Sequence, residues 1–220
     1  MATLELGILV SGSGTNLQAI IDAIAARTLQ ARIRLVVSNR PAVKAIERAR
    51  SANVPVRVVS HKDFADRPSF DRALVGALRE AGAEWVVLAG FMRVLTPVFL
   101  DAFPMRVINV HPALLPAFPG VDAQAQALAY GVRVTGCSVH FVDSGTDTGP
   151  IIAQAAVPVR FDDTRDSLAA RILTREHQLL ATVLQWISED RVHVLPPDQA
   201  ARPRVRVDGA LPWFGVEDAS

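Results

Sequence analysis

The chain has little of several features that define whole classes of protein. Cys137 is the single cysteine among 220 residues, so an intramolecular disulfide and a zinc site built from several cysteines are excluded. No apolar run approaches the ~20 residues that a membrane-spanning helix requires. The formal net charge is only +1, which gives no basic stripe of the kind that binds nucleic acid. We therefore expect a cytoplasmic protein without membrane or nucleic-acid partners.

Apolar residues are abundant and make up 50% of the chain. A chain of this length buries roughly 70% of the surface that it exposes when unfolded, which excludes a disordered protein. Lys44 and Lys62 are the only lysines among 23 basic residues. Scattered arginines balanced by acids are most simply explained by codon usage in a GC-rich genome. The composition predicts one or two folded domains, and one is favoured.

Apolar runs alternate with helical patterns through the first half of the chain. The runs are apolar throughout, which indicates strands buried on both faces of a parallel sheet. The expected strands are 6–11, 32–38, 54–59, 85–89 and 106–110, and the expected helices are 17–24, 42–51 with Pro41 in the first turn, and 68–81. The carboxyl ends of such strands meet at one edge, where ligands bind. The loops that begin at Gly12, Gly90 and Asn109 should therefore converge on one crevice.

The second half departs from this alternation. Three prolines and a glycine in residues 111–120 predict a rigid loop. The expected elements after it are a helix at 123–130, strands at 134–143 and 150–157, a long amphipathic helix at 165–187 and a hairpin at 204–209. The predicted fold is α/β, with a Rossmann-like, doubly wound, mostly parallel sheet. Its C-terminal part adds further strands and a long helix.

A glycine turn, Gly12-Ser13-Gly14, stands between the first strand and the first helix. Backbone N–H groups of such a turn, together with the helix N-terminus, bind anions. The turn lacks the lysine of a P-loop, and Leu17 stands where a dinucleotide fingerprint has its third glycine. We prefer a cradle for a monophosphate, and a purely structural turn is the alternative.

Two further clusters carry groups suited to acid–base chemistry. Asn109 and His111 are two residues apart at a strand end, so their side chains can point the same way. An amide donor beside an imidazole suits a carbonyl oxygen that becomes negative, and histidine carries protons near neutral pH. Asp143 or Asp147, in a glycine-rich loop, can reach that imidazole and favour its protonated form. The alternatives are a histidine that caps the strand, a plain turn, and a weak calcium site that the absence of an EF-hand pattern disfavours.

The other candidate residues are expected to be structural. Cys137 has no dedicated base beside it, so we predict a small core residue rather than a nucleophile. His140 stands in an alternating strand and is expected to be a sheet residue. His61 and His193 stand among polar neighbours and are expected to be solvated.

Several separated motifs together resemble the folate-dependent formyltransferases. The motifs are Leu88-Ala89-Gly90-Phe91-Met92-Arg93-Val94-Leu95, Asn109-Val110-His111-Pro112-Ala113-Leu114-Leu115-Pro116, and Gly149-Pro150-Ile151-Ile152 with Gln154. The resemblance runs from residue 7 to about 186. It implies a single formyltransferase domain over 1–195, with a phosphate-binding half at about 1–105 and a folate-binding, catalytic half at about 106–195. Residues 196–220 would form a C-terminal extension, expected to be a hairpin.

The resemblance also implies an activity and its chemistry. A formyl group would pass from 10-formyltetrahydrofolate, a cosubstrate consumed in each turnover, to the amine of 5′-phosphoribosylglycinamide in de novo purine synthesis. The implied catalytic residues are Asn109 and protonated His111, which stabilise the oxyanion, and Asp147, which keeps His111 protonated and orders a proton-relay water. No metal is implied. The partners would be the two small-molecule substrates, and the protein would be a monomer or a homodimer.

The substrate-binding residues follow from the same resemblance. The phosphate and ribose would be bound by Gly14, Thr15, Asn16 and Glu176. The folate would be bound by Arg67, Met92, Arg93, Val94, Leu95, Asn109, Asp143, Ser144, Gly145, Thr146 and Asp147. Asp122 departs from the family, where a histidine often stands, so an auxiliary role at this position is in doubt.

Three other functions stay open at this point. A formyltetrahydrofolate deformylase uses water as the acceptor, and a methionyl-tRNA formyltransferase uses a charged tRNA. The first normally carries an additional N-terminal domain and the second a basic C-terminal domain, and we expect neither here. A non-catalytic nucleotide-binding module would explain the glycine turn, but it would leave Asn109, His111 and Asp147 unexplained.

Overall fold

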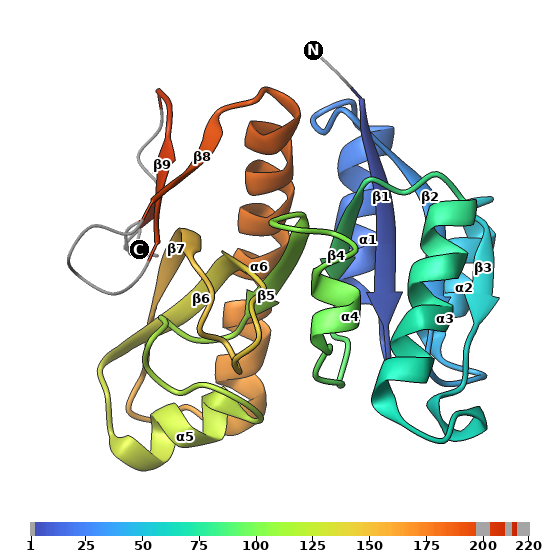
Figure 1. Ribbon diagram of the computed structural model, residues 1–220. Coiled ribbons are helices and arrows are strands. Elements are labelled where there is room, and N and C mark those ends of the chain that lie inside the picture. Colours follow the sequence, from blue (N-terminus) through green and yellow to red (C-terminus); the bar gives the residue numbers. More distant parts are fainter. Residues whose placement is uncertain (1–2, 197–202, 210–212, 215–220) are drawn as a thin grey trace.

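The computed structural model describes residues 3–196, 203–209 and 213–214. An eight-stranded sheet has the order β10-β7-β6-β5-β4-β1-β2-β3, and β8 and β9 form a separate two-stranded sheet (Figure 1). The strands are β1 Leu4–Val10, β2 Ala31–Ser38, β3 Val56–Val58, β4 Trp85–Leu88, β5 Val107–His111, β6 Val134–Phe141, β7 Ile151–Pro158, β8 Val192–Leu195, β9 Arg204–Val207 and β10 Trp213–Phe214. The helices are α1 Thr15–Ala25, α2 Lys44–Ser51, the 3₁₀ helix η1 His61–Asp63, α3 Arg67–Glu80, α4 Pro97–Leu100, α5 Ala123–Tyr130 and α6 Arg165–Ser188.

The sheet changes from parallel to antiparallel at β6. Strands β3, β2, β1, β4 and β5 are parallel, whereas β6 runs antiparallel to both β5 and β7. The edge strand β10 pairs with β7 in parallel. The predicted α/β fold, with a mostly parallel sheet, added C-terminal strands and a long helix, is confirmed.

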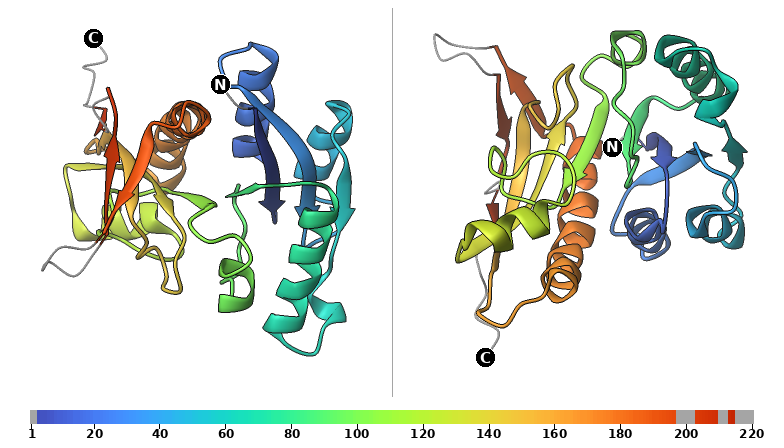
Figure 2. Two further views of the ribbon diagram at one scale, coloured as in Figure 1. Left: turned by 45° about the horizontal axis from the view of Figure 1, so that its top comes forward. Right: turned by 90° about the horizontal axis from the view of Figure 1, so that it is seen from below.

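Helices cover both faces of the sheet (Figure 2). Helices α1, α2 and α6 pack on one face, and α3 and α4 pack on the other, so each face has its own hydrophobic core. Strand β1 serves both cores because its side chains alternate: Leu6 and Ile8 belong to the first cluster and Leu9 to the second. No helix among the described residues is long and apolar enough to cross a membrane.

Two elements of the first half differ from the prediction. Helix α2 begins at Lys44, not at Pro41, because Ala42 has a left-handed backbone with φ of 54°. Tertiary contact sets this start: the Ala45 amide donates to the Gly12 carbonyl at 3.2 Å. The short helix α4 was not predicted, since its four residues are too few to show a helical period.

The segment of the predicted hairpin at 204–209 contains strand β9. Strand β9 pairs antiparallel with β8, which precedes it, and not with a strand that follows Gly209. Val207 is buried and β9 also contacts β7, so burial against the large sheet decides the partner. Of the expected extension, residues 197–202, 210–212 and 215–220 lie outside the described residues.

Candidate active site

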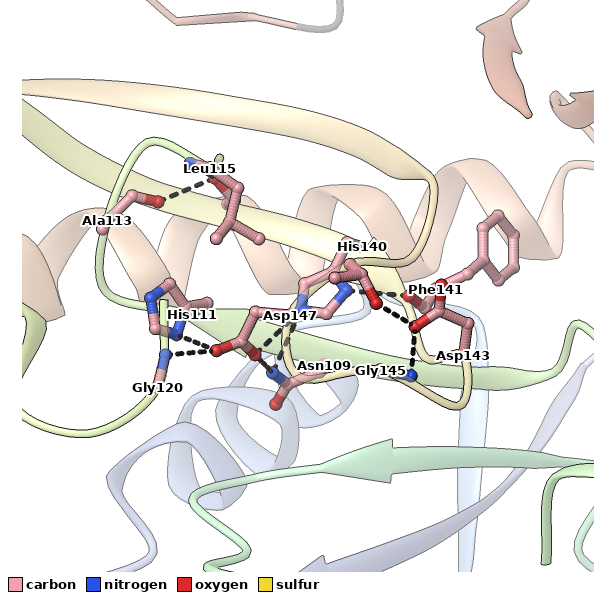
Figure 3. A network of polar contacts seen from close by, with 12 residues as sticks. Asn109, His111, Ala113, Leu115, Gly120, His140, Phe141, Asp143, Gly145 and Asp147 are labelled. Carbon is pink, nitrogen blue, oxygen red and sulfur yellow. Dashed lines mark hydrogen bonds and ion pairs between the residues drawn. The ribbon is translucent and has the colours of Figure 1, made fainter. Parts of the chain in front are cut away.

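Four polar side chains share one face where β5 meets β6. In the antiparallel register Asn109 lies opposite His140, and His111 lies opposite Ser138. Side chains of alternate residues point to the same face, and directly opposite residues are near neighbours. The expectation that Asn109 and His111 point the same way is therefore met, and Figure 3 shows both beside Asp147.

Asp147 reaches this face from the loop between β6 and β7. Its Oδ2 lies 3.3 Å from Nδ1 of His111 and accepts a hydrogen bond from the Gly120 amide at 2.8 Å. Its Oδ1 accepts from Nδ2 of Asn109 at 3.4 Å. The three predicted catalytic residues thus meet in one cluster, although Asn109 and Asp147 are 38 positions apart along the chain.

The Asp147 carboxyl is held in its charged form. Burial alone would raise its pKa, but the hydrogen bonds from His140 and Gly120 and the positive charges of His111 and His140 lower it more. The net effect is a pKa below the ordinary value of an aspartate. The cluster therefore contains a carboxylate in contact with an imidazole that is only 4% exposed.

His111 has an acceptor at each ring nitrogen. Its Nε2 lies 2.8 Å from the carbonyl oxygen of Phe118, and its Nδ1 faces Asp147. A carbonyl oxygen only accepts hydrogen bonds, so Nε2 must carry a proton. The Asp147 carboxylate is likewise an acceptor, so both ring nitrogens of His111 are placed to donate hydrogen bonds.

His140 belongs to the site, which the sequence prediction missed. It is a buried sheet residue as predicted, but its Nε2 lies 3.1 Å from Nδ2 of Asn109 and 3.7 Å from Oδ1 of Asp147. Its Nδ1 lies 2.7 Å from the Phe141 carbonyl and therefore carries a proton, while its Nε2 faces both Asn109 and Asp147. The only signal for this role is the β5–β6 register, which the sequence does not reveal.

Ser138 braces the proline-rich loop that follows β5. Its hydroxyl donates to the Ala113 carbonyl at 2.7 Å and accepts from the Leu115 amide at 3.0 Å. Gln154 on β7 donates to the Leu115 carbonyl at 3.0 Å and to the same hydroxyl at 2.9 Å. These bonds fix the loop that carries Phe118 and Gly120 over the site.

A pocket of about 520 Å³ lies at the carboxyl end of β1 and is lined by Gly14, Thr15, Asn16 and Glu176, as well as Arg40 and Met92. Asn16 donates from Nδ2 to Oε2 of Glu176 at 2.8 Å, and burial raises the Glu176 pKa. Oδ1 of Asn16 is buried and has no hydrogen-bond partner. A larger cavity, of about 690 Å³, lies between α1, β2 and α2 and is lined by none of the predicted site residues.

The residues expected to bind folate are distributed around the site. Met92 and Val94 are 66% and 52% exposed, Leu95 is buried, and the Arg93 guanidinium lies 5.7 Å from the ring centroid of Phe70. Arg67 is the first residue of α3, which also carries Phe70. In the 143–147 loop, residues 143–146 are exposed. Asp143 bonds within this loop, to the Gly145 amide and the Thr148 hydroxyl, so only Asp147 joins the cluster.

The remaining candidates have structural partners. Asp122 pairs with Arg165 at 2.8 Å, and Cys137 is a buried core residue, as predicted. His61 and His193 are half-buried rather than solvated, beside Asn39 and Asp208 respectively. No group of three or more histidine, cysteine, aspartate or glutamate residues that could hold a metal ion is found within the described part of the chain.

Comparison with known proteins gives a consistent result. The Formyl transferase family model matches residues 5–184. The chain is 40% identical to phosphoribosylglycinamide formyltransferase of Escherichia coli, over 86% of this chain and 89% of that protein. It is 49% identical to the trifunctional purine biosynthetic protein adenosine-3 of Drosophila melanogaster, over 87% of this chain but only 14% of that much longer protein.

Solved structures agree with the sequence relatives. The structure of glycinamide ribonucleotide transformylase 1 from Symbiobacterium toebii superposes with a TM-score of 0.89 at 44% identity, and the match covers 93% of this chain and 94% of that one. The family model covers most of the chain, and both the sequence and the fold match over most of their length. The chain therefore belongs to the formyl transferase family.

Proposed function

We propose that this protein transfers a formyl group from 10-formyltetrahydrofolate to the amine of 5′-phosphoribosylglycinamide, a step of purine biosynthesis, without a metal. The observation that carries the proposal is the pairing of two sites at one edge of the sheet. A glycine-lined pocket lies at the end of β1, and the Asn109–His111–Asp147 cluster lies at the end of β5. Family membership and the relatives' names support the same reaction.

The phosphorylated substrate fits the pocket by charge and by hydrogen bonding. The amides of Gly14, Thr15 and Asn16 stand at the N-terminus of α1, where a phosphate is stabilised by unpaired N–H groups and the helix dipole. Glu176 offers a buried acceptor for a ribose hydroxyl, and the unpartnered Oδ1 of Asn16 offers a second.

The folate cosubstrate would bind beside this pocket. Met92 and Val94 present exposed apolar side chains for its ring system, next to Leu95 and the Arg93 guanidinium. Arg67 and the loop of Asp143, Ser144, Gly145 and Thr146 complete the surface that we assign to it. The folate supplies the formyl group, which leaves with the product.

The cluster can stabilise the charge that develops during transfer. When the amine nitrogen attacks the formyl carbon, a C–N bond forms, the bond to the folate nitrogen breaks, and the formyl oxygen is transiently negative. Asn109 and protonated His111 donate hydrogen bonds to this oxygen. The proton lost by the amine reaches the departing folate nitrogen through a water ordered by Asp147.

Both donors must change partners for this to occur. Nε2 of His111 is bonded to the Phe118 carbonyl, and the two N–H groups of Asn109 face His140 and Asp147. The formyl oxygen would replace Phe118 at His111 and one of the two side chains that face the Asn109 amide. Substrate binding is therefore expected to move the loop that carries Phe118.

Incubation of the purified protein with both substrates tests the proposal, with mass spectrometry of the ribonucleotide as the readout. We expect the N-formyl product, and we expect its loss in His111→Ala. Formate released at the same rate without the ribonucleotide would instead identify a deformylase. Ligand binding without turnover would identify a binding module.

A further inference from the structure

Ser11 links two loops that the proposed function assigns to different substrates. It follows β1 directly and is 3% exposed. Its hydroxyl donates to Oδ1 of Asn39, after β2, at 2.7 Å, and it accepts from the backbone amide of Met92, after β4, at 3.0 Å. One hydroxyl thus joins the carboxyl ends of three neighbouring strands.

The hydrogen bonds around Ser11 all run in one direction. Met92 donates to Ser11, Ser11 donates to Asn39, and Nδ2 of Asn39 faces Nδ1 of His61 at 3.4 Å. Asn39 is 2% exposed, so its amide has little access to solvent. A hydroxyl can accept one bond while donating another, whereas an alanine at this position could do neither.

The far end of the Met92 loop is anchored separately. Asp71 is 1% exposed, and its Oδ2 accepts from both the amide and the hydroxyl of Thr96, at 2.6 and 2.7 Å. Ser11 and Asp71 therefore anchor residues 92–96 at both ends, and this stretch includes residues 92–95, which we assign to the folate. Ser11, unlike Asp71, also adjoins the phosphate loop, because it directly precedes the Gly12-Ser13-Gly14 turn.

The phosphate loop has its own supports, which do not use the Ser11 hydroxyl. The Ala45 amide donates to the Gly12 carbonyl at 3.2 Å, and Nε of Arg48 donates to the Ser13 carbonyl at 3.0 Å. A change confined to the Ser11 side chain should leave this loop in place.

We infer that Ser11 is a positioning residue, whose hydroxyl sets the Met92 loop relative to the phosphate loop and so controls the affinity for the folate cosubstrate. This inference rests on the proposed function. Removing the hydroxyl leaves the Met92 amide and Oδ1 of Asn39 without their partner. The Met92 loop is then no longer fixed in position, and folate binding weakens.

Steady-state kinetics of Ser11→Ala test the inference, with Ser188→Ala as the matched control. Ser188 is also a buried serine, but its hydroxyl bonds to the Gln185 carbonyl near the end of α6. In Ser11→Ala the KM for the folate should rise about 3- to 10-fold, the range for losing the bond to the Met92 amide, and kcat should change by less than about twofold. Ser11 and Met92 also line the pocket that we assign to the ribonucleotide, so its KM should rise as well, but by less, because the phosphate loop keeps its own supports. Ser188→Ala should change neither KM.

A double-mutant cycle separates positioning from general destabilisation. Asn39→Ala removes the acceptor of the Ser11 hydroxyl. As a single substitution it should raise the folate KM, but in the Ser11→Ala background it should add little. Additive effects, an unchanged folate KM in Ser11→Ala, or equal increases in both KM values would overturn the inference. If the unmutated protein forms no product, the proposed function itself fails, whatever the variants do.

Discussion

Replacing Asp147 by asparagine tests the electrostatic part of the proposed mechanism, because the two side chains have the same shape and differ in charge. The carboxylate lies 3.3 Å from the His111 ring, and both side chains are largely buried. With an effective dielectric constant of about 20, two unit charges at this separation attract by about 5 kcal/mol, which is an upper bound for a pair that water partly reaches. An asparagine oxygen can still accept from the Gly120 amide.

The expected result is a kcat lower by about 10²- to 10³-fold, the cost of losing one charged donor to a developing oxyanion. Each tenfold step corresponds to about 1.4 kcal/mol, so this loss is about 2.8 to 4.2 kcal/mol, or roughly 55 to 85% of the Coulomb attraction. The KM for the ribonucleotide should not change, because Asp147 lies outside the pocket lined by Gly14 and Glu176. Initial rates of product formation, with the ribonucleotide varied, measure both quantities.

The pH dependence gives a second readout of the same group. Because the Asp147 pKa is lowered in the folded state, its charge and its contribution to stability are fully present above the unfolded value of about 3.9 and are lost as pH falls through the lower folded value.

Asp101→Asn, which changes an exposed carboxylate, is the matched control for Asp147→Asn. A folded Asp147→Asn variant that keeps more than about a tenth of kcat would show that the charge on Asp147 is not needed for formyl transfer.

Three further predictions concern stability, reactivity and the phosphate loop. Burial raises the Cys137 pKa to about 12, so iodoacetamide at pH 8 should alkylate this thiol only after unfolding, and mass measurement of the native protein checks this. The Asp163 carboxylate is 2% exposed and paired with an arginine, so Asp163→Ala should lower the free energy of unfolding by about 3 kcal/mol. Asp166→Ala, at an exposed site, should leave it nearly unchanged, and urea titrations measure both variants. Gly14→Ala places a Cβ 2.6 Å from a side chain of α2 at φ of 69°, so the ribonucleotide KM should rise about 5- to 30-fold, with Gly76→Ala unaffected.

Much of the fold could be predicted because its signals are local. The helix at Ala123–Tyr130 lies where it was expected, and α6 differs from the prediction by one residue at its end. The start of α2 could not be predicted, because the contact between Ala45 and Gly12 decides it. Local patterns indicate which segments are helices and strands, while packing between distant segments decides where they begin and what they pair with.

In the candidate site, too, some features follow from local sequence patterns and others depend on the assembled fold. The spacing of Asn109 and His111 predicts a shared direction, and the family motifs point to Asp147. The role of His140 depends on which residue of β5 it faces, and that register is a property of the assembled sheet. The Phe118 carbonyl at His111 was equally hidden, since a backbone oxygen leaves no trace in the residue pattern.

The strand order sets the distance that the substrate must span. Strand β4 separates β1, which leads into the glycine turn that we propose for the phosphate, from β5, which carries Asn109 and His111. Neighbouring strands lie about 4.8 Å apart, so two steps set roughly 10 Å between the phosphate anchor and the transfer site. Under the proposed function, a molecule is selected by whether its amine reaches the cluster while its phosphate is bound. An analogue with one bond fewer between these groups would bind the cradle and hold its amine out of reach of the formyl carbon.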